Sequence, residues 1–463
     1  MGARFYDVLN HAFYLLFILF CILFYKERLF DMDAANYAWQ ILNQKDFYIP
    51  HDRYINYITQ SPAVWLIKQD WPLKQVLITY SATFGVLFYL LYILFRYTMR
   101  SPLWASFPML GLLLSFRYKH FAGHTEIVVA IFLSGILLAF AFSPKFKKLK
   151  PYIKWPFLLV LMGIVSYTHP IMIIPLGLVF FGHICYTKEY YKTEFLLILL
   201  SLLVIFGLRF WAAMDNDYES DKIGYVSNIF NVMIHPDQYD SAKIIVKYML
   251  TDYLPVLAFL AFIMFKFIKG GRSLYVLYFI LANYGLFVLI GTMEFYLRGN
   301  IYFLIDGYLG MFALLWGYPI LKYLQLNDSK ILRYITVAIL LVSASQIVQK
   351  STFFRGRLDY FREISKAHPD HSKYYVSMNL HNWDELWYPY FIPQEFMLLT
   401  ALDGKDNCKT LYINFNGVDE NEFKKKNTFW LYSGSKSIDE LNPNYFKLPP
   451  EPYKKLNNVP WPK

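Results

Sequence analysis

Long apolar runs separated by short polar segments dominate the first three quarters of the chain. A helix of about 20 apolar residues is long enough to cross roughly 30 Å of hydrocarbon. Such runs predict about eleven membrane-spanning helices, at approximately 6–25, 77–97, 103–117, 126–143, 155–167, 170–187, 195–213, 247–265, 274–293, 299–321 and 334–348. The sequence therefore predicts a polytopic α-helical membrane protein.

The segment 155–187 decides the predicted orientation, because it could form one over-long helix or two helices broken at Tyr167-Thr168-His169-Pro170. With two helices, one side of the membrane collects a set of basic residues: Arg4, Arg96, Arg100, Lys145, Lys147, Lys148, Lys150, Lys154, Lys188, Lys192, Lys266, Lys269, Arg272, Lys322, Lys330 and Arg333. The other side holds a set of acidic residues: Asp31, Asp33, Asp215, Asp217, Glu219, Asp221, Asp237 and Asp240. An excess of Lys and Arg marks the cytoplasmic side. We therefore expect two helices here, an N-terminus inside the cytoplasm and, after an odd number of spans, a C-terminus outside it.

The last quarter of the chain has no long apolar run. Its patterns predict helices around Arg355–Ala367 and Gln394–Leu402, and β-strands near 373–378, 409–415 and 428–432. Two domains follow from this change in pattern. A transmembrane domain covers 1–348 and contains a long first extracytoplasmic loop at 26–76, and a small extracytoplasmic α/β domain with an extended Pro-rich tail covers 349–463.

Composition supports a membrane protein and excludes other classes. Hydrophobic residues make up 56% of the chain and charged residues 17%, whereas soluble domains average about 25% charged residues. The net charge of +11 resides largely in short loops, so no basic stripe for a nucleic acid is expected. Cys21, Cys185 and Cys408 are too few and too scattered for a disulfide framework or a zinc finger. The first apolar run has no cleavage site after it, and we expect it to stay in the membrane.

Two carboxylates open the first extracytoplasmic loop, which is far longer than a connector requires. Asp31 and Asp33 follow directly after the first predicted span. A carboxylate at this position can accept a proton from an acceptor hydroxyl, or bind a divalent cation that steadies a phosphate leaving group. The alternative is structural, since either residue could cap a predicted surface helix at 34–42.

The second extracytoplasmic loop is dense in polar residues, with Arg117, Lys119, His124 and Glu126 within ten positions. His124 and Glu126 have the chemistry of an acid–base pair or of metal ligands, although two ligands do not specify a cation. The alternatives are basic side chains that extend toward the membrane surface and a Glu that caps the next span.

Three further residues are expected on the same side of the membrane. His169 lies in the turn between two spans, and Glu294 and Arg298 lie at the outer ends of two later ones. Arg298 opposes the positive-inside bias, and a guanidinium there suits a phosphate or diphosphate head group. Its structural alternative is an ion pair with Glu294 or with Asp306, an acid inside a span and therefore a functional candidate in itself.

These features together resemble the GT-C class of membrane glycosyltransferases. Asp31-Met32-Asp33 is similar to the acidic motif of the first loop, His124-Thr125-Glu126 to a second acidic or His-containing motif, and Gly163 to His169-Pro170 to a glycine-then-basic stretch that usually has Lys. Arg298 is a looser match. The likeness covers about 1–321 in architecture, with motifs of two or three residues each, and 349–463 carries no motif of the class.

The resemblance implies a sugar transferase of the cell envelope that uses a polyprenyl-phosphate or -diphosphate sugar as donor. Asp31 or Asp33 would then be the catalytic base or a metal ligand, and Arg298, helped by Arg117 and Lys119, would hold the donor phosphate. His124, Glu126, His169 and Glu294 would support the site. The partners are a lipid-linked donor, membrane lipids and a glycan, lipid or protein acceptor, without nucleic acid; a divalent cation is the candidate cofactor. A bacterial inner membrane fits this chemistry.

Other functions remain open from the sequence. A transporter or flippase of lipid-linked intermediates would place ionisable residues near the membrane midplane, whereas here they lie at the outer rim. A polysaccharide polymerase or ligase would use a late loop, for which 215–248 is the candidate. An envelope assembly protein would use 349–463 as a binding module.

Overall fold

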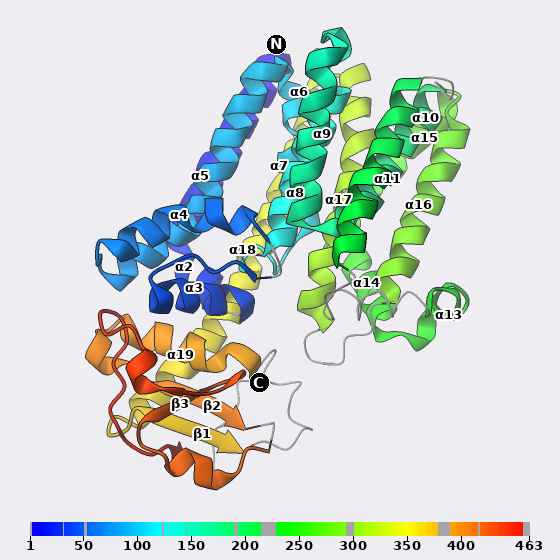
Figure 1. The fold of residues 1–463 in the computed structure, drawn as a ribbon. Helices are drawn as coiled ribbons and strands as arrows, with labels where there is room; N and C mark the ends of the chain where they lie inside the picture. The colour runs from blue at the N-terminus through cyan, green and yellow to red at the C-terminus, as the bar shows by residue number, and fades with distance from the viewer. Residues whose placement is uncertain are drawn as a thin grey trace.

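The computed structural model describes residues 2–30, 32–50, 53–122, 125–144, 146–188, 193–213, 228–292, 301–377, 389–414 and 417–456. Figure 1 shows a bundle of long helices with a small sheet-containing domain at the end opposite the N-terminus. Five helical segments among these residues are long and apolar enough to cross a membrane: Arg4–Leu23, Leu73–Met99, Pro170–Thr187, Ser273–Gly291 and Lys330–Ala367. A sixth results if Asp240–Leu250 and Leu254–Lys269, bent by 77°, count as one span.

The helices of the bundle coincide with the apolar runs of the sequence, because a long apolar segment buries its backbone polar groups best as a helix. They are α1 (Gly2–Leu23), α5 (Leu73–Met99), α6 (Pro102–Ala105), α7 (Phe107–Ser115), α8 (Glu126–Phe142), α9 (Pro151–Thr168), α10 (Ile173–Thr187), α11 (Thr193–Ala213), α13 (Ile229–Ile234), α14 (Asp240–Leu250), α15 (Leu254–Lys269), α16 (Ser273–Gly291), α17 (Ile301–Leu326) and α18 (Lys330–Ala367). The predicted break within 155–187 is confirmed, since α9 ends at Thr168 and α10 begins at Ile173.

The centre of the bundle is formed by α7, α8 and α17, whose side chains are almost all buried. Close packing there requires glycine. A Cβ on Gly135 of α8 would lie 2.7 Å from the Cα of Pro108 in α7. The short helices α7 and α8 therefore lie inside the bundle, wrapped by the longer ones.

The long loop at 26–76 is helical, as its amphipathic patterns predict. It forms α2 (Tyr25–Leu29), α3 (Met32–Gln44) and α4 (Ile55–Lys68). These helices lie between the bundle and the C-terminal domain (Figure 1), so they can bring residues of the first loop to both.

The C-terminal domain contains a small parallel sheet. Its elements are β1 (Lys373–Ser377), α19 (Ile392–Ala401), β2 (Thr410–Asn414), β3 (Thr428–Leu431), β4 (Gly434–Ser437) and β5 (Lys454–Lys455). Strands β2, β1 and β5 pair in parallel in that order, with Tyr374 opposite Leu411, and β3 and β4 form a hairpin. The predicted strands and the helix around 394–402 are confirmed within a few residues.

The boundary between the two domains is not a linker. Helix α18 runs from Lys330 to Ala367 without interruption, so the helix predicted at 355–367 is its last part. The first loop and the C-terminal domain also share one hydrophobic core. The ring of Trp39 in α3 lies 6.2 Å from those of Phe429 and Phe446. The C-terminal domain is therefore packed directly on the first loop.

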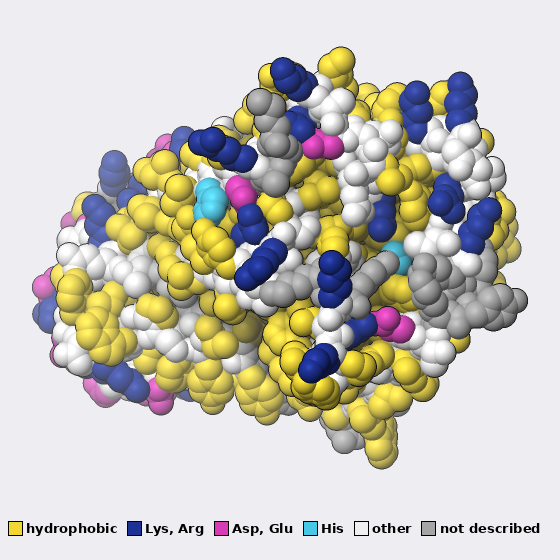
Figure 2. Space-filling view, turned by 90° about the horizontal axis from the view of Figure 1, so that it is seen from above, with side chains coloured by type: hydrophobic (Ala, Val, Ile, Leu, Met, Phe, Trp, Pro, Cys, Tyr) yellow, Lys and Arg dark blue, Asp and Glu magenta, His cyan; other side chains and the backbone are white. Residues whose placement is uncertain are grey.

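Figure 2 shows the opposite end of the bundle, where Lys and Arg side chains surround an apolar surface and acidic ones are sparse. Acids on this end are often paired with the cations. Arg96 bonds to Asp7, Lys154 to Glu194 and Arg333 to Asp328.

Candidate functional site

The acidic pair of the first loop begins α3 at the end of the bundle that carries the C-terminal domain. Asp33 lies half-buried in the first turn of α3, where a carboxylate interacts favourably with the helix N-terminus. Asp31 lies outside the described residues. The structural alternative for Asp33 is this interaction with the N-terminus of α3.

Tyr37 connects the first loop to α8. It lies four positions after Asp33 and hence on the same face of α3. Its hydroxyl donates a 3.0 Å hydrogen bond to Oε1 of Glu126, the first residue of α8. Burial, and then the charges of Glu126 and Asp33, raise the pKa of Tyr37 well above its usual value. The phenol thus stays protonated and holds the Glu126 carboxylate beside Asp33.

Arg53 supplies a positive charge to this pair of acids. Arg53 is 4% exposed. Burial raises the pKa of Glu126, the charge of Arg53 opposes this shift, and the charge of Asp33 adds to it. Nη1 of Arg53 also donates to the carbonyl oxygen of Thr168, at 3.4 Å. Arg53 therefore bridges the acids and the turn between α9 and α10.

His169 lies in that turn, as predicted, and its ring has a structural role there. Nδ1 accepts a 3.4 Å hydrogen bond from the amide of Ile171 and caps the 3-10 turn at Pro170–Met172. Arg209, near the end of α11, stacks on the other side chain of the turn, with its guanidinium carbon 5.2 Å from the ring centre of Tyr167. Arg209 is 7% exposed, and its buried Nε has no hydrogen-bond partner.

Four distant segments thus meet at one place: the start of α3, the loop at Arg53, the start of α8 and the α9–α10 turn. We name Asp33, Tyr37, Arg53 and Glu126 the acidic cluster. Sequence reasoning predicted Asp33 and Glu126 but not Arg53 or Arg209. Nothing in the sequence distinguishes Arg53 from the other basic residues of the first loop, such as Lys45 and Lys68.

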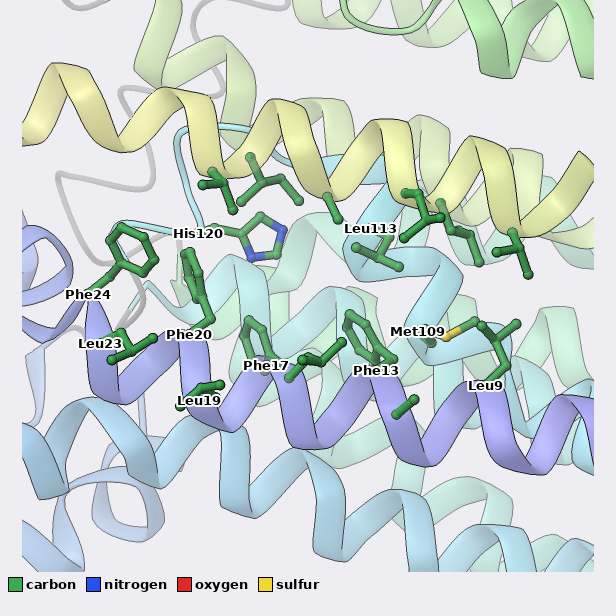
Figure 3. Close-up of a pocket in the computed structure, with 18 residues that line it drawn as sticks. Leu9, Phe13, Phe17, Leu19, Phe20, Leu23, Phe24, Met109, Leu113 and His120 are labelled. Atoms are coloured by element: carbon green, nitrogen blue, oxygen red, sulfur yellow. The ribbon is translucent and has the colours of Figure 1, made fainter.

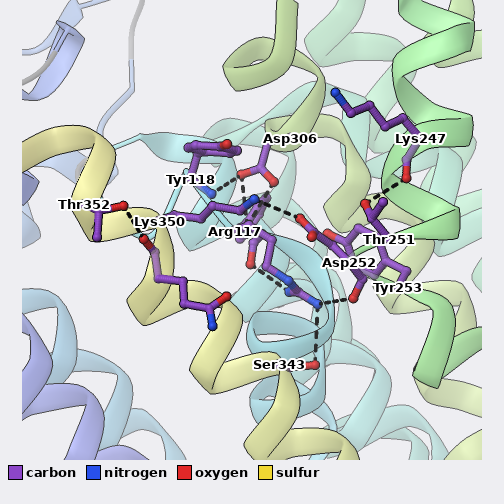
Figure 4. A network of polar contacts seen from close by, with 12 residues as sticks. Arg117, Tyr118, Lys247, Thr251, Asp252, Tyr253, Asp306, Ser343, Lys350 and Thr352 are labelled. Atoms are coloured by element: carbon purple, nitrogen blue, oxygen red, sulfur yellow. Dashed lines mark hydrogen bonds and ion pairs between the residues drawn. The ribbon is translucent and has the colours of Figure 1, made fainter. Parts of the chain in front are cut away.

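Arg117 and Lys119 belong to a second polar group around Asp306. Figure 4 shows Arg117, Tyr118 and Asp306 of this group inside the bundle. The carboxylate of Asp306 in α17 accepts hydrogen bonds of 2.8–3.1 Å from the backbone amides of Arg117, Tyr118 and Lys119. Successive amides that converge on one anion form a stable loop conformation. Asp306 therefore fixes the loop that precedes Glu126.

The position of Arg117 argues against its predicted phosphate role. Its side chain is fully buried, and its guanidinium donates to the carbonyl oxygens of Leu113 and Phe116 and lies 4.5 Å from the ring centre of Tyr253. Lys119 is 6% exposed, and its Cε would contact a Cβ on Gly307 at 3.0 Å. Both side chains point into the bundle, where a donor phosphate at the surface would not reach them.

The remaining predicted residues, Asp31, His124, Glu294 and Arg298, lie outside the described residues. Within the part of the chain that the structure describes, no group of three or more His, Cys, Asp or Glu side chains is arranged to hold a metal ion. Asp33 and Glu126 would supply two carboxylate ligands to a divalent cation.

An apolar groove runs along α1, from Leu9 toward the first loop. It has a volume of about 450 Å³ and is lined by α1, α7 and α18, with residues such as Phe17, Phe20, Leu113 and Leu340. His120 is the polar side chain among its lining residues, and its Nε2 is 3.2 Å from the carbonyl oxygen of Leu112 (Figure 3). The groove follows α1 as far as Phe24, just before the helices of the first loop.

The chain matches no protein-family model, no curated protein and no solved structure.

Proposed function

We propose that this chain is a membrane glycosyltransferase that moves a sugar from a polyprenyl-phosphate or -diphosphate carrier to an acceptor. The observation that carries the proposal is the acidic cluster, in which Asp33 and Glu126 lie together with Arg53 and Tyr37 at the end of a membrane-type bundle. Paired carboxylates next to a guanidinium can accept a proton and stabilise a departing phosphate at one place.

The reaction would use Asp33 as the base. As the acceptor oxygen attacks the anomeric carbon, its proton passes to the Asp33 carboxylate, and the bond from that carbon to the phosphate oxygen breaks. The phosphate leaves with the bonding electron pair. Tyr37 donates a hydrogen bond to Glu126 and the charge of Arg53 attracts it, so both hold Glu126 in the acidic cluster with Asp33. A single displacement of this kind inverts the anomeric carbon.

Arg53 and Arg209 are better candidates for the phosphate than Arg117 or Lys119. Both contact the Tyr167–Thr168 turn, and the buried Nε of Arg209 has no partner. A guanidinium can bind phosphate oxygens through two parallel N–H groups. The apolar groove of α1 and α18 would take the hydrocarbon of the carrier, since both helices are long and apolar enough to cross the membrane.

The proposal includes the membrane arrangement expected from the sequence: eleven spans, an N-terminus in the cytoplasm and a C-terminal domain outside it, in a bacterial inner membrane. The Lys and Arg side chains around the N-terminal end of the bundle support this orientation (Figure 2). In this orientation the acidic cluster faces the extracytoplasmic side.

The test is sugar transfer by the purified protein from a panel of polyprenyl-phosphate and -diphosphate sugars. We expect Asp33→Asn to bind donor and to lower turnover by about 10²–10⁴-fold, the usual contribution of a general base. Asp46→Asn is the matched control, because Asp46 is an exposed acid of the same loop that pairs with Lys68. If the wild type binds the donor and the Asp33→Asn and Asp46→Asn variants turn it over at equal rates, the role of Asp33 is refuted.

A transporter of lipid-linked intermediates is the second candidate. The charged residues Arg117, Asp252, Asp306 and Lys350 inside the bundle favour it, because buried ionisable groups mark many transport pathways. Reconstituted protein that moves a lipid-linked sugar across a bilayer without releasing carrier phosphate would establish this function in place of sugar transfer.

A further inference from the structure

The first two residues of α3, Met32 and Asp33, which we name the acidic turn, are held by a residue of the C-terminal domain. Glu395, in α19, is fully buried, and its Oε1 accepts a 3.2 Å hydrogen bond from the amide of Met32. Met32 lies between Asp31 and Asp33, 363 positions earlier in the chain. The carboxylate therefore contacts the backbone of the predicted catalytic motif itself.

Glu395 is in turn fixed by Arg357 of α18. Nε of Arg357 donates to Oε2 at 2.8 Å and Nη2 donates to Oε1 at 3.0 Å, so the pair is bidentate. Arg357 is 7% exposed. Two parallel hydrogen bonds leave the carboxylate little rotational freedom, and the oxygen that Met32 uses is held at one position.

The backbone that Glu395 holds is in an unfavourable conformation. Met32 has φ of +48°, in the left-handed region that residues with a Cβ seldom adopt. Such conformations persist where the surroundings determine them, and they cluster at functional sites. The hydrogen bond that the Met32 amide donates to Glu395 stabilises this conformation at the first residue of α3, the helix that carries Asp33 and Tyr37.

We propose that Glu395 is a positioning residue, through which the C-terminal domain holds the acidic turn and completes the candidate active site. This inference rests on the proposed function for its catalytic consequence. Stability alone does not require the Arg357–Glu395 ion pair, because an apolar pair of similar size often stabilises a protein as well as a buried ion pair does. What an apolar pair cannot supply is an acceptor for the Met32 amide.

Two double variants separate these roles. Arg357→Met with Glu395→Gln removes both charges and keeps a carbonyl oxygen for the Met32 amide. Arg357→Met with Glu395→Leu removes both charges and the acceptor. Each avoids a buried unpaired charge, the main cause of misfolding when one partner of such a pair is removed.

The first measurement is hydrogen exchange of the Met32 amide in the purified full-length protein, which needs no donor. We expect exchange on the order of tenfold faster in the Leu variant than in the Gln variant, because the amide loses its acceptor. The second measurement is sugar transfer. We expect the Leu variant to lose about tenfold in kcat while KM for the donor stays within about threefold, and the Gln variant to retain kcat within about threefold.

Asn442→Ala is the control for domain docking. Nδ2 of Asn442 donates to the carbonyl oxygen of Leu42 at 2.7 Å, at the far end of α3, so its loss weakens the same interface away from the acidic turn. We expect it to leave Met32 exchange unchanged. Equal Met32 exchange in the two double variants would overturn the positioning role. Absence of transfer by the wild type would refute the proposed function, and the exchange comparison would still decide the role of Glu395.

Discussion

Arg53 and Arg209 bring two positive charges to the turn between α9 and α10. Both are more than nine-tenths buried, and they approach the turn from the first loop and from the end of α11. A buried N–H without an acceptor, such as Nε of Arg209, is unfavourable until it is paired. A phosphate at this turn would satisfy that donor.

We predict that Arg209→Gln raises the KM for the lipid-linked donor by about tenfold, equivalent to about 1.4 kcal/mol, because a charge-assisted contact to the phosphate is lost. The change in kcat should stay within about threefold if the contact is made equally in the ground and transition states. Lys68→Gln is the control, since it removes one charge from an exposed side chain at the same end of the molecule. An unchanged donor KM in Arg209→Gln would exclude the phosphate role.

At the scale of elements, much of the helical architecture was predictable from sequence. Apolar length predicts α1, α5 and α16, and the break at Pro170 predicts the separation of α9 and α10. The polar loops were harder. Arg117 was expected at the surface because it is basic and lies between spans, but the loop folds into the bundle around the Asp306 carboxylate.

Two residues of the acidic cluster, Asp33 and Glu126, were predictable from the sequence, but their contacts with Tyr37 and Arg53 were not. A predicted topology places Asp33, Glu126 and His169 on one side of the membrane, which brings them near the same surface. It does not tell which side chains touch. The Tyr37–Glu126 hydrogen bond, the Arg53–Thr168 contact and the Glu395–Met32 contact join residues 89, 115 and 363 positions apart. Such pairings depend on the packing of whole elements, which no local pattern encodes.

The strand β1 carries a buried lysine whose titration should be measurable. Lys373 is fully buried, and its Nζ donates to the carbonyl oxygens of Lys426 and Thr428 at 2.6 and 2.9 Å. Burial lowers the pKa of Lys373 from 10.5 to about 8, and the Glu451 carboxylate partly opposes this shift. Between these two values the unfolded chain holds a proton that the folded domain has released.

We therefore predict that the free energy of unfolding of the C-terminal domain rises with pH from about 8 to 10.5, because the unfolded state binds more protons in that window. Below about pH 8 the proton is bound in both states and this contribution is constant. Pulse proteolysis in urea, with domain fragments identified by mass spectrometry, measures the stability. The rise should be smaller in Lys373→Met than in Lys447→Met, whose side chain is 66% exposed; equal slopes in the two variants would contradict the prediction.

At the scale of the whole molecule, the first loop and the C-terminal domain behave as one body. They share a hydrophobic core, and hydrogen bonds join them at both ends of α3, at Met32 and at Leu42. Helix α18 connects this body to the bundle without a flexible joint. An acceptor bound by the C-terminal domain would therefore be presented to the acidic cluster at a fixed position.

The orientation of the molecule in the membrane decides which substrates can reach that position. The three cysteines are buried, so a cysteine introduced at an exposed site should dominate labelling by a membrane-impermeant maleimide. Tyr432 is 47% exposed on the C-terminal domain, and Asn327 is exposed in the loop between α17 and α18 at the opposite end. We predict that Tyr432→Cys is labelled on intact cells, from which any outer membrane has been removed, and Asn327→Cys only after lysis.

The reverse result would place the acidic cluster in the cytoplasm, where soluble nucleotide-activated sugars are available and a lipid-linked donor is not required. Labelling thus tests the choice of donor class before any sugar is tried.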